Sequence, residues 1–416
     1  MIQTGLQKLS KKWKVVTPLT VPDFRCLWLA NILWWQTRWM EQIIIGWVVL
    51  ELTNSAGQVA LVGFYRMLPF LLFGPFISTV AARFSYRRII IVSQIVNVFL
   101  FAALSFLVLS GRLEFWHLAV GSVLIGIGGA YDWSSRRALI PDLVGKDRTL
   151  DAMVLENIPQ NISRVAGPFV SGIILEYLGV EGGFPLLFGM YVVELAILTR
   201  MSHSTDSTAD TGSGSSWKDL KEGYHYIRSS QPIMGVLLIT LFMNALTFPY
   251  QTLLPVFARD ILHQGPIGLG ILGASIGIGA FIGIVPVNWL KRYGRSGWIL
   301  AGSSILGSAA IIGFALSTSY SLSIFLLIVT GIGQSGFSVM QSSIILKSAS
   351  DSMRARMIGA LALAIGGGPL GRLQIGGLAT ILGSPVALAL SAGAALIGIA
   401  GTLLKVPGFR DKDAID

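Results

Sequence analysis

The sequence contains little charge and almost no cysteine. Only 12% of its 416 residues are Asp, Glu, Lys or Arg, 53% are hydrophobic, and the mean hydropathy is +0.69. A water-soluble domain carries about 25% charged residues, so this composition excludes an ordinary soluble protein. The single cysteine, Cys26, excludes a disulfide framework and any multi-cysteine metal site. The four histidines are scattered along the chain, and the sequence predicts neither a metal site nor a cofactor.

What the chain does contain is a series of apolar stretches of bilayer length. A helix needs about 20 mostly apolar residues to cross a membrane. We predict an all-α membrane protein with twelve transmembrane helices and no separate domain outside the bilayer. The predicted helices are 27–51, 57–81, 88–110, 116–137, 152–177, 183–200, 233–257, 266–290, 297–318, 321–346, 356–381 and 384–405.

The Lys and Arg residues are distributed unevenly between the predicted loops. Most of the 31 lie at the two ends and in alternate loops, whereas the remaining loops hold only Arg112 and Arg259. Because basic residues are retained on the cytoplasmic side, we predict that both termini are cytoplasmic in a bacterial inner membrane. The net charge of +10 then reflects orientation and attraction to anionic lipid headgroups, and nucleic acid is not predicted as a partner.

A polar segment divides the chain near its midpoint. Residues His203–Ser216 are rich in Ser, Thr, Gly and Asp, a composition typical of a flexible linker. The tripeptide Gly-Ile-Gly occurs in the fourth predicted helix (126–128) and again in the tenth (331–333), which favours two pseudo-symmetric six-helix bundles. The predicted segments are a basic N-terminal segment (1–26), a first bundle (27–200), a linker (201–232), a second bundle (233–405) and a tail (406–416).

One face of the first predicted helix is polar at mid-membrane depth. Its members are Asn31, Trp34, Arg38, Glu41 and Gln42. A charge at the bilayer centre costs about 2.5–3.5 kcal/mol on insertion scales, so such residues face a partner or a watery cavity. The alternative is hydrogen bonding between helices or, for the arginines Arg66 and Arg164, a structural ion pair. We predict a substrate and proton pathway that also includes Arg66, Arg164, Asn244, Thr247, Gln251, Gln334, Ser338 and Gln341.

Several short motifs together carry a resemblance to a known family. They are Phe24–Trp28, Gly46–Trp47, Glu51–Ser55, Arg66–Pro69, Tyr131–Asp132, Leu139–Val144, Arg164–Pro168 and Leu253–Arg259. With these motifs the chain resembles the major facilitator superfamily, and within it bacterial permeases of the enterobactin-exporter and macrolide-efflux type. The resemblance implies twelve helices in two bundles, alternating access, and a central cavity lined by helices 1, 4, 7 and 10.

The loop after the second predicted helix departs from the superfamily signature. Ala82 stands where the signature has the aspartate that is thought to latch the cytoplasmic gate. We predict that a substitute acid, with Asp142 as the candidate, completes a gate formed by Arg83, Arg87, Arg88, Asp132, Arg136 and Asp142. Glu194 lies under two turns from the inner end of its predicted helix, which favours an interfacial position.

The sequence predicts a secondary active transporter and not an enzyme, because no Walker loop, Ser–His–Asp set or metal-ligand spacing is present. We expect a monomer that exports a small amphipathic organic molecule, drug-like or siderophore-like, driven by protons and in contact with membrane lipids. An uptake permease or a lysolipid flippase of the same fold is the alternative. A membrane enzyme or a non-transporting sensor is the alternative from another class.

Two expectations concern the chemistry of the pathway. Glu41 is expected to carry the coupled proton, because it is the only carboxylate predicted near mid-membrane. Burial raises the proton affinity of a carboxyl group, whereas Arg38, one turn away, lowers it. Anionic or zwitterionic substrates are expected, because Arg38, Arg66, Arg164 and Arg372 would face this single acid. Trp34 and Trp35 would stack on an aromatic part of the substrate.

Overall fold

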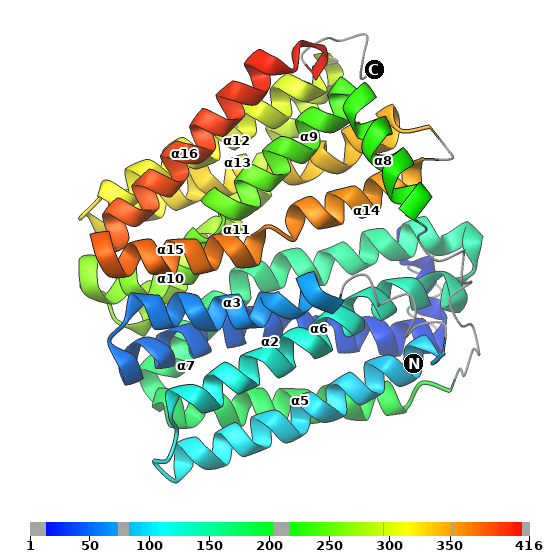
Figure 1. Ribbon diagram of the computed structural model, residues 1–416. Helices are drawn as coiled ribbons and strands as arrows, with labels where there is room; N and C mark the ends of the chain where they lie inside the picture. Colours follow the sequence, from blue (N-terminus) through cyan, green and yellow to red (C-terminus); the bar gives the residue numbers. More distant parts are fainter. Residues whose placement is uncertain (1–13, 74–82, 203–216, 294, 351–352, 410–416) are drawn as a thin grey trace. The chain divides into compact units, whose positions relative to one another are not determined.

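The computed structural model describes residues 14–73, 83–202, 217–293, 295–350 and 353–409 (Figure 1). Within these ranges every regular element is a helix. Nine helical stretches of the described residues are long and apolar enough to cross a membrane, and one of them, Lys146–Thr199, contains two of the predicted helices. With α2 (Pro22–Thr53) and α6 (Phe115–Val144) they make up the predicted set of twelve.

The helices fall into two compact units. The first comprises Met1–Val48 and Tyr65–Gly212, and the second comprises Val49–Phe64 and Ser213–Asp416. The boundary at residue 212 lies within the predicted linker, whereas the end of α2 and the beginning of α3 (Ala56–Phe73) group with the second unit. Ala82, the predicted flexible stretch His203–Ser216 and the first 13 and last seven residues lie outside the described ranges.

The first unit is built from α2, α3, α5 (Tyr86–Leu109), α6 and α7 (Thr149–Thr199), with the short helices η1 (Lys14–Thr20) and η3 (Lys146–Arg148). Helix α5 packs against both α6 and α7. The two helices predicted at 152–177 and 183–200 appear as one element with a break at Gly179, whose φ of 65° suits a residue without a side chain. An apolar cluster with Phe24, Leu27, Ile90 and Ile140 packs α2, α5 and α6 together.

The second unit contains the remaining elements. They are α8 (Trp217–Ser229), α9 (Gln231–Phe242), η4 (Met243–Thr247), α10 (Tyr250–Val256), η5 (Phe257–Ile261), α11 (Pro266–Leu290), η6 (Lys291–Tyr293), α12 (Ser296–Leu316), α13 (Tyr320–Ser348), α14 (Arg354–Ile365), α15 (Gly368–Leu382), α16 (Ser384–Lys405) and η7 (Pro407–Phe409). Helix α13 packs against both α11 and α12, and α12 packs against α16. The second half of the predicted linker 201–232 is therefore helical, because it contains α8 and the start of α9.

Two predicted helices of the second unit are interrupted. The helix predicted at 233–257 contains π turns: the Phe248 N–H donates to the Met243 carbonyl five residues back at 2.8 Å, and the Leu262 N–H donates to Phe257 at 2.9 Å. The proline that follows the first π turn, Pro249, has no N–H with which to continue the ladder. The helix predicted at 356–381 divides into α14 and α15 at a run of three glycines, 366–368, followed by a proline.

Helices α11 and α13 meet backbone to backbone at glycines. A Cβ added at Gly331 would overlap the Ile276 carbonyl oxygen, so we expect Gly331→Ala to lower the free energy of unfolding by about 1–3 kcal/mol through overpacking. Gly393→Ala in α16 is the control, because a Cβ there meets nothing within 4 Å. Thermal unfolding in detergent measures both, and equal midpoints for the two variants would contradict this account of the contact.

Candidate functional site

Two clusters of charged and polar side chains lie inside the first unit. The Glu41 cluster comprises Arg38, Glu41, Arg66 and Tyr191, and the Arg136 cluster comprises Asn31, Gln94, Asp132, Arg136, Glu156 and Glu194. Both clusters draw on α2, on which Asn31 and Glu41 are ten residues apart. At a rise of about 1.5 Å per residue the clusters are separated by about 15 Å along this helix.

In the Glu41 cluster two arginines share one buried carboxylate. Arg66 Nη2 donates to Glu41 Oε1 at 2.5 Å, and Arg38 Nη1 lies 3.3 Å from the same oxygen. The Tyr191 hydroxyl, which α7 contributes, donates to the other oxygen at 3.0 Å. The Glu41 side chain is fully buried, whereas 17% of Arg38 and 13% of Arg66 remain exposed. The cluster therefore has one positive charge in excess when its acid is ionised, and its cations are more accessible than its acid.

Glycines of α6 make room for this cluster. A Cβ added at Gly129 would lie 2.9 Å from Arg38 Nη2, and a Cβ at Gly126 would overlap the Arg66 carbonyl oxygen. The first Gly-Ile-Gly tripeptide thus lies where α3 approaches α6. Gly331 of the second tripeptide has the equivalent contact with the α11 backbone at Ile276, so the repeat marks close helix packing in both units.

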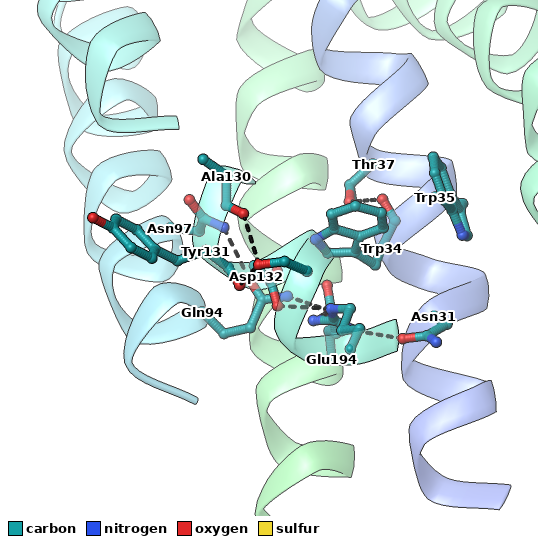
Figure 2. Close-up of polar contacts among 12 residues, drawn as sticks. Asn31, Trp34, Trp35, Thr37, Gln94, Asn97, Ala130, Tyr131, Asp132 and Glu194 are labelled. Atoms are coloured by element: carbon teal, nitrogen blue, oxygen red, sulfur yellow. Dashed lines mark hydrogen bonds and ion pairs between the residues drawn. The ribbon is translucent and has the colours of Figure 1, made fainter. Parts of the chain in front are cut away.

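In the Arg136 cluster one guanidinium binds three side chains, those of Asn31, Asp132 and Glu194, which are labelled in Figure 2. Arg136 Nε donates to Asp132 Oδ1 at 2.7 Å, one turn earlier on α6. Its Nη1 donates to Asn31 Oδ1 of α2 at 2.6 Å, and its Nη2 donates to Glu194 Oε1 of α7 at 2.6 Å. Arg136, Asp132 and Glu194 are each at most 3% exposed. The fork of this arginine therefore ties three helices together in the interior of the unit.

Neutral groups extend the Arg136 cluster to a third acid and to α5. The Asn31 amide donates to Glu156 Oε2 at 2.7 Å, and Trp35 Nε1 donates to Glu156 Oε1 at 3.1 Å. On α5 the Gln94 amide donates to Glu194, and Asn97 donates to Gln94 at 3.0 Å. Each acid of the cluster thus has at least one donor.

Trp34 lies between the two clusters. Its ring centroid is 5.6 Å from Cζ of Arg38 and 5.1 Å from Cζ of Arg136, which are cation–π distances. The side chain is only 3% exposed, and its ring meets the Trp35 ring edge-on at 4.7 Å. Trp34 therefore links the two guanidinium groups, and its expected stacking on a substrate stays a prediction. Trp35 is half-buried.

Some sequence-based expectations require correction. Glu194 was expected at the membrane interface, but it is fully buried, because α5 and α6 supply the partners Gln94 and Arg136 that its own helix does not reveal. The unit thus buries Asp132, Glu156 and Glu194 besides Glu41, so the surplus of arginines over acids is smaller than predicted. That Glu41 is the only carboxylate near mid-membrane depth stays a prediction. Arg66 forms an ion pair with Glu41, and its part in the pathway stays a prediction. The Arg164 guanidinium lies 5.7 Å from the Trp39 ring, and the choice between a pathway role and an ion pair stays open for this residue.

The residues predicted to form a gate differ in burial, and their joint role stays a prediction. Arg83, Arg88 and Asp142 are exposed, and Arg87 donates to the Thr199 carbonyl at 3.4 Å. Asp132 and Arg136 instead lie in the buried Arg136 cluster.

The predicted polar residues of the second unit bond largely to one another and to the backbone. Asn244 donates to the Thr240 carbonyl at 2.9 Å, and Ser338 donates to the Gln334 carbonyl at 2.8 Å. Across helices, Thr240 bonds to Gln341 at 3.3 Å, and Thr247 bonds to Ser308 at 2.9 Å. Gln42 and Gln251 are half-buried. Their part in a pathway stays a prediction.

Sequence reasoning missed Gln94, Asn97 and Tyr191. A usable signal existed for the first two, because a glutamine and an asparagine three residues apart share one face of the otherwise apolar helix 86–109. Tyr191 carried no such signal, because a tyrosine is common in any membrane helix.

Within the described residues, nine apolar helical stretches together with α2 and α6 lie in two units, and the first unit holds charged side chains in its interior. This arrangement is typical of a multi-pass membrane transporter of the major facilitator fold. A family model described as transmembrane secretion effector matches residues 14–416, and the chain belongs to this family of the major facilitator superfamily. Its relatives are transporters, so the chain is a transporter and not an enzyme.

Two relatives and one solved structure illustrate the similarity. The chain is 25% identical to the staphyloferrin A transporter of Staphylococcus aureus over 66% of this chain and 69% of that protein. It is 23% identical to the multidrug efflux pump Tap of Mycolicibacterium fortuitum over 88% and 91%. The crystal structure of a bacterial homologue of the human lysosomal transporter Spinster superposes with a TM-score of 0.69 at 15% identity, covering 93% of this chain and 95% of that one.

Proposed function

We propose that this protein is a proton-coupled exporter of a small amphipathic organic molecule, working by alternating access as a monomer in a bacterial inner membrane with both termini in the cytoplasm. The relatives support export as the direction, because one is a multidrug efflux pump. The staphyloferrin A transporter supports a siderophore-like molecule as the substrate class.

The Glu41 cluster carries the proposal. Two partly exposed guanidinium groups stand in front of one fully buried carboxylate. In a medium of low dielectric constant the excess positive charge favours a ligand that brings negative charge. We infer that the substrate presents a carboxylate or another anionic group to Arg38 and Arg66, while Glu41 holds the two side chains in place when no substrate is bound.

Transport by the purified protein in proteoliposomes tests the function. We expect staphyloferrin A to exchange across the membrane in counterflow and to accumulate when a pH gradient is imposed. In a thermal-shift assay we expect a carboxylate or catecholate siderophore to raise the unfolding midpoint and to resist competition by ethidium, because a lipophilic cation is repelled by the arginines.

Two outcomes would contradict the proposal. Tighter binding of ethidium than of the carboxylate ligand would remove the charge argument. Counterflow of macrolides or lysolipids without any response to a pH gradient would contradict proton-coupled export and favour one of the alternative transport modes. An absence of exchange with all of these probes would contradict transport of this substrate class.

A further inference from the structure

The Arg136 cluster contains more acid than base. Asp132 and Glu194 both bind the same guanidinium, at 2.7 and 2.6 Å. The third acid, Glu156, is bound by Asn31 and Trp35. Asp132 and Glu194 therefore compete for the single positive charge of Arg136.

The other groups that face this pair do not balance it. Helix α2 supplies Asn31, Trp34 and, beyond the Trp34 ring, Arg38, which is bound to Glu41. Helix α5 supplies the neutral Gln94 and Asn97. Helix α6 adds Arg137, whose guanidinium lies 4.8 Å from the Trp133 ring. Helix α7 supplies Glu156, and Tyr191 bound to Glu41.

Each of the two competing acids also has an oxygen without a partner. Asp132 Oδ2 and Glu194 Oε2 are buried and have no hydrogen bond within the part of the chain that the structure describes. A buried carboxylate oxygen that accepts no hydrogen bond is costly, and two carboxylates sharing one site in low dielectric cannot both ionise without a large penalty. A proton on either acid reduces the negative charge of the pair to one, which a single arginine neutralises.

We infer that Asp132 and Glu194 share one proton, and that this pair, rather than Glu41, exchanges the proton that drives transport. The proton belongs to the pair as a unit. Glu41 is a poor carrier, because two guanidinium groups and a phenol already bind its two oxygens. In this scheme Glu41 is a positioning residue for Arg38 and Arg66.

Two short connections link the shared proton to the proposed substrate site. The Trp34 ring lies between Arg136 and Arg38. Tyr191 lies about one turn from Glu194 on α7 and donates to Glu41. A change in how Arg136 divides its hydrogen bonds between Asp132 and Glu194 therefore reaches the Glu41 cluster through packed side chains. This coupling rests on the proposed function, whereas the shared proton itself does not.

Infrared spectroscopy of the purified full chain tests the shared proton without a substrate. At neutral pH we expect the carbonyl band of a buried, protonated carboxyl group in the wild type. Either Glu194→Gln or Asp132→Asn alone is expected to abolish the band completely, because the remaining acid then has Arg136 to itself and ionises. Glu41→Gln and Glu156→Gln are the matched controls and should leave the band in place.

Other outcomes overturn the inference. These are a wild type without the band, a band that survives both Glu194→Gln and Asp132→Asn, or a band abolished by Glu41→Gln or Glu156→Gln alone. If either Glu194→Gln or Asp132→Asn does not fold, the other variant is still expected to lose the band. Both variants retain Arg136.

A transport measurement separates this inference from the proposed function. In proteoliposomes we expect Glu194→Gln and Asp132→Asn to lose at least tenfold of the pH-gradient-driven accumulation of staphyloferrin A while keeping its counterflow exchange. A wild type that shows the band but no proton-driven transport contradicts the proposed function and leaves the shared proton standing. Proton-driven transport by a wild type without the band contradicts the shared proton and leaves the proposed function standing. If both variants accumulate staphyloferrin A as the wild type does, the pair has no role in proton coupling.

Discussion

Replacing Arg136 by glutamine is expected to lower the free energy of unfolding by about 3–5 kcal/mol. The substitution leaves Asp132 and Glu194 buried together without their shared cation, and it removes the bond to Asn31 that ties α2 to α6. For a unit of this size the loss corresponds to a fall of roughly 6–20 °C in the unfolding midpoint. Thermal unfolding of the purified protein in detergent measures the change.

The neighbouring arginine provides the control. Arg137 lies over the Trp133 ring at 4.8 Å and is half-buried, so Arg137→Gln should cost about 1 kcal/mol, in the range of a partly exposed cation–π contact. Adding Asp132→Asn and Glu194→Gln to the Arg136→Gln variant should restore part of the lost stability, because these two positions then no longer carry buried charges without their cation. A cost for Arg136→Gln no larger than that for Arg137→Gln would show that Arg136 does not hold the cluster together.

The double substitution Arg38→Gln and Arg66→Gln is expected to weaken binding of a carboxylate siderophore by roughly 10²–10⁴-fold. Each arginine offers a charge-assisted hydrogen bond worth about 1.5–3 kcal/mol, and each 1.4 kcal/mol is a factor of about ten in affinity. Equilibrium binding of staphyloferrin A to the purified protein, with ethidium as competitor, measures the loss. Relief of the positive charge should at the same time favour the cation.

Loss of folding must be distinguished from loss of the site. The double variant leaves Glu41 buried without a cation, so a triple variant with Glu41→Gln removes all three charges and should recover stability but not anion binding. Arg164→Gln serves as the comparison for an intramembrane arginine outside both clusters. If this variant loses as much affinity as the double variant, or if the triple variant binds the siderophore normally, the Glu41 cluster is not where the anion binds.

The sequence by itself determined the membrane class, the number of spanning helices and the polar face of α2. These properties follow from apolar length and from the 3.6-residue period of a single helix, which are local to each segment. Asn31, Trp34, Arg38 and Glu41 could therefore be recognised as a set before any contact was known.

Only the tertiary structure decided which acid meets which arginine. Glu194 and Arg136 are 58 residues apart, and Asn31 and Arg136 are 105 apart, so no helical period relates them. Considered on its own helix, Glu194 lies close enough to the end to reach the interface, and Arg66 has no evident partner. The contact of α6 with α7 gives Glu194 its partner Arg136, and the contact of α3 with α2 gives Arg66 its partner Glu41. The partners of a buried charge are set by the distances between helices, whereas a sequence records only positions along one helix.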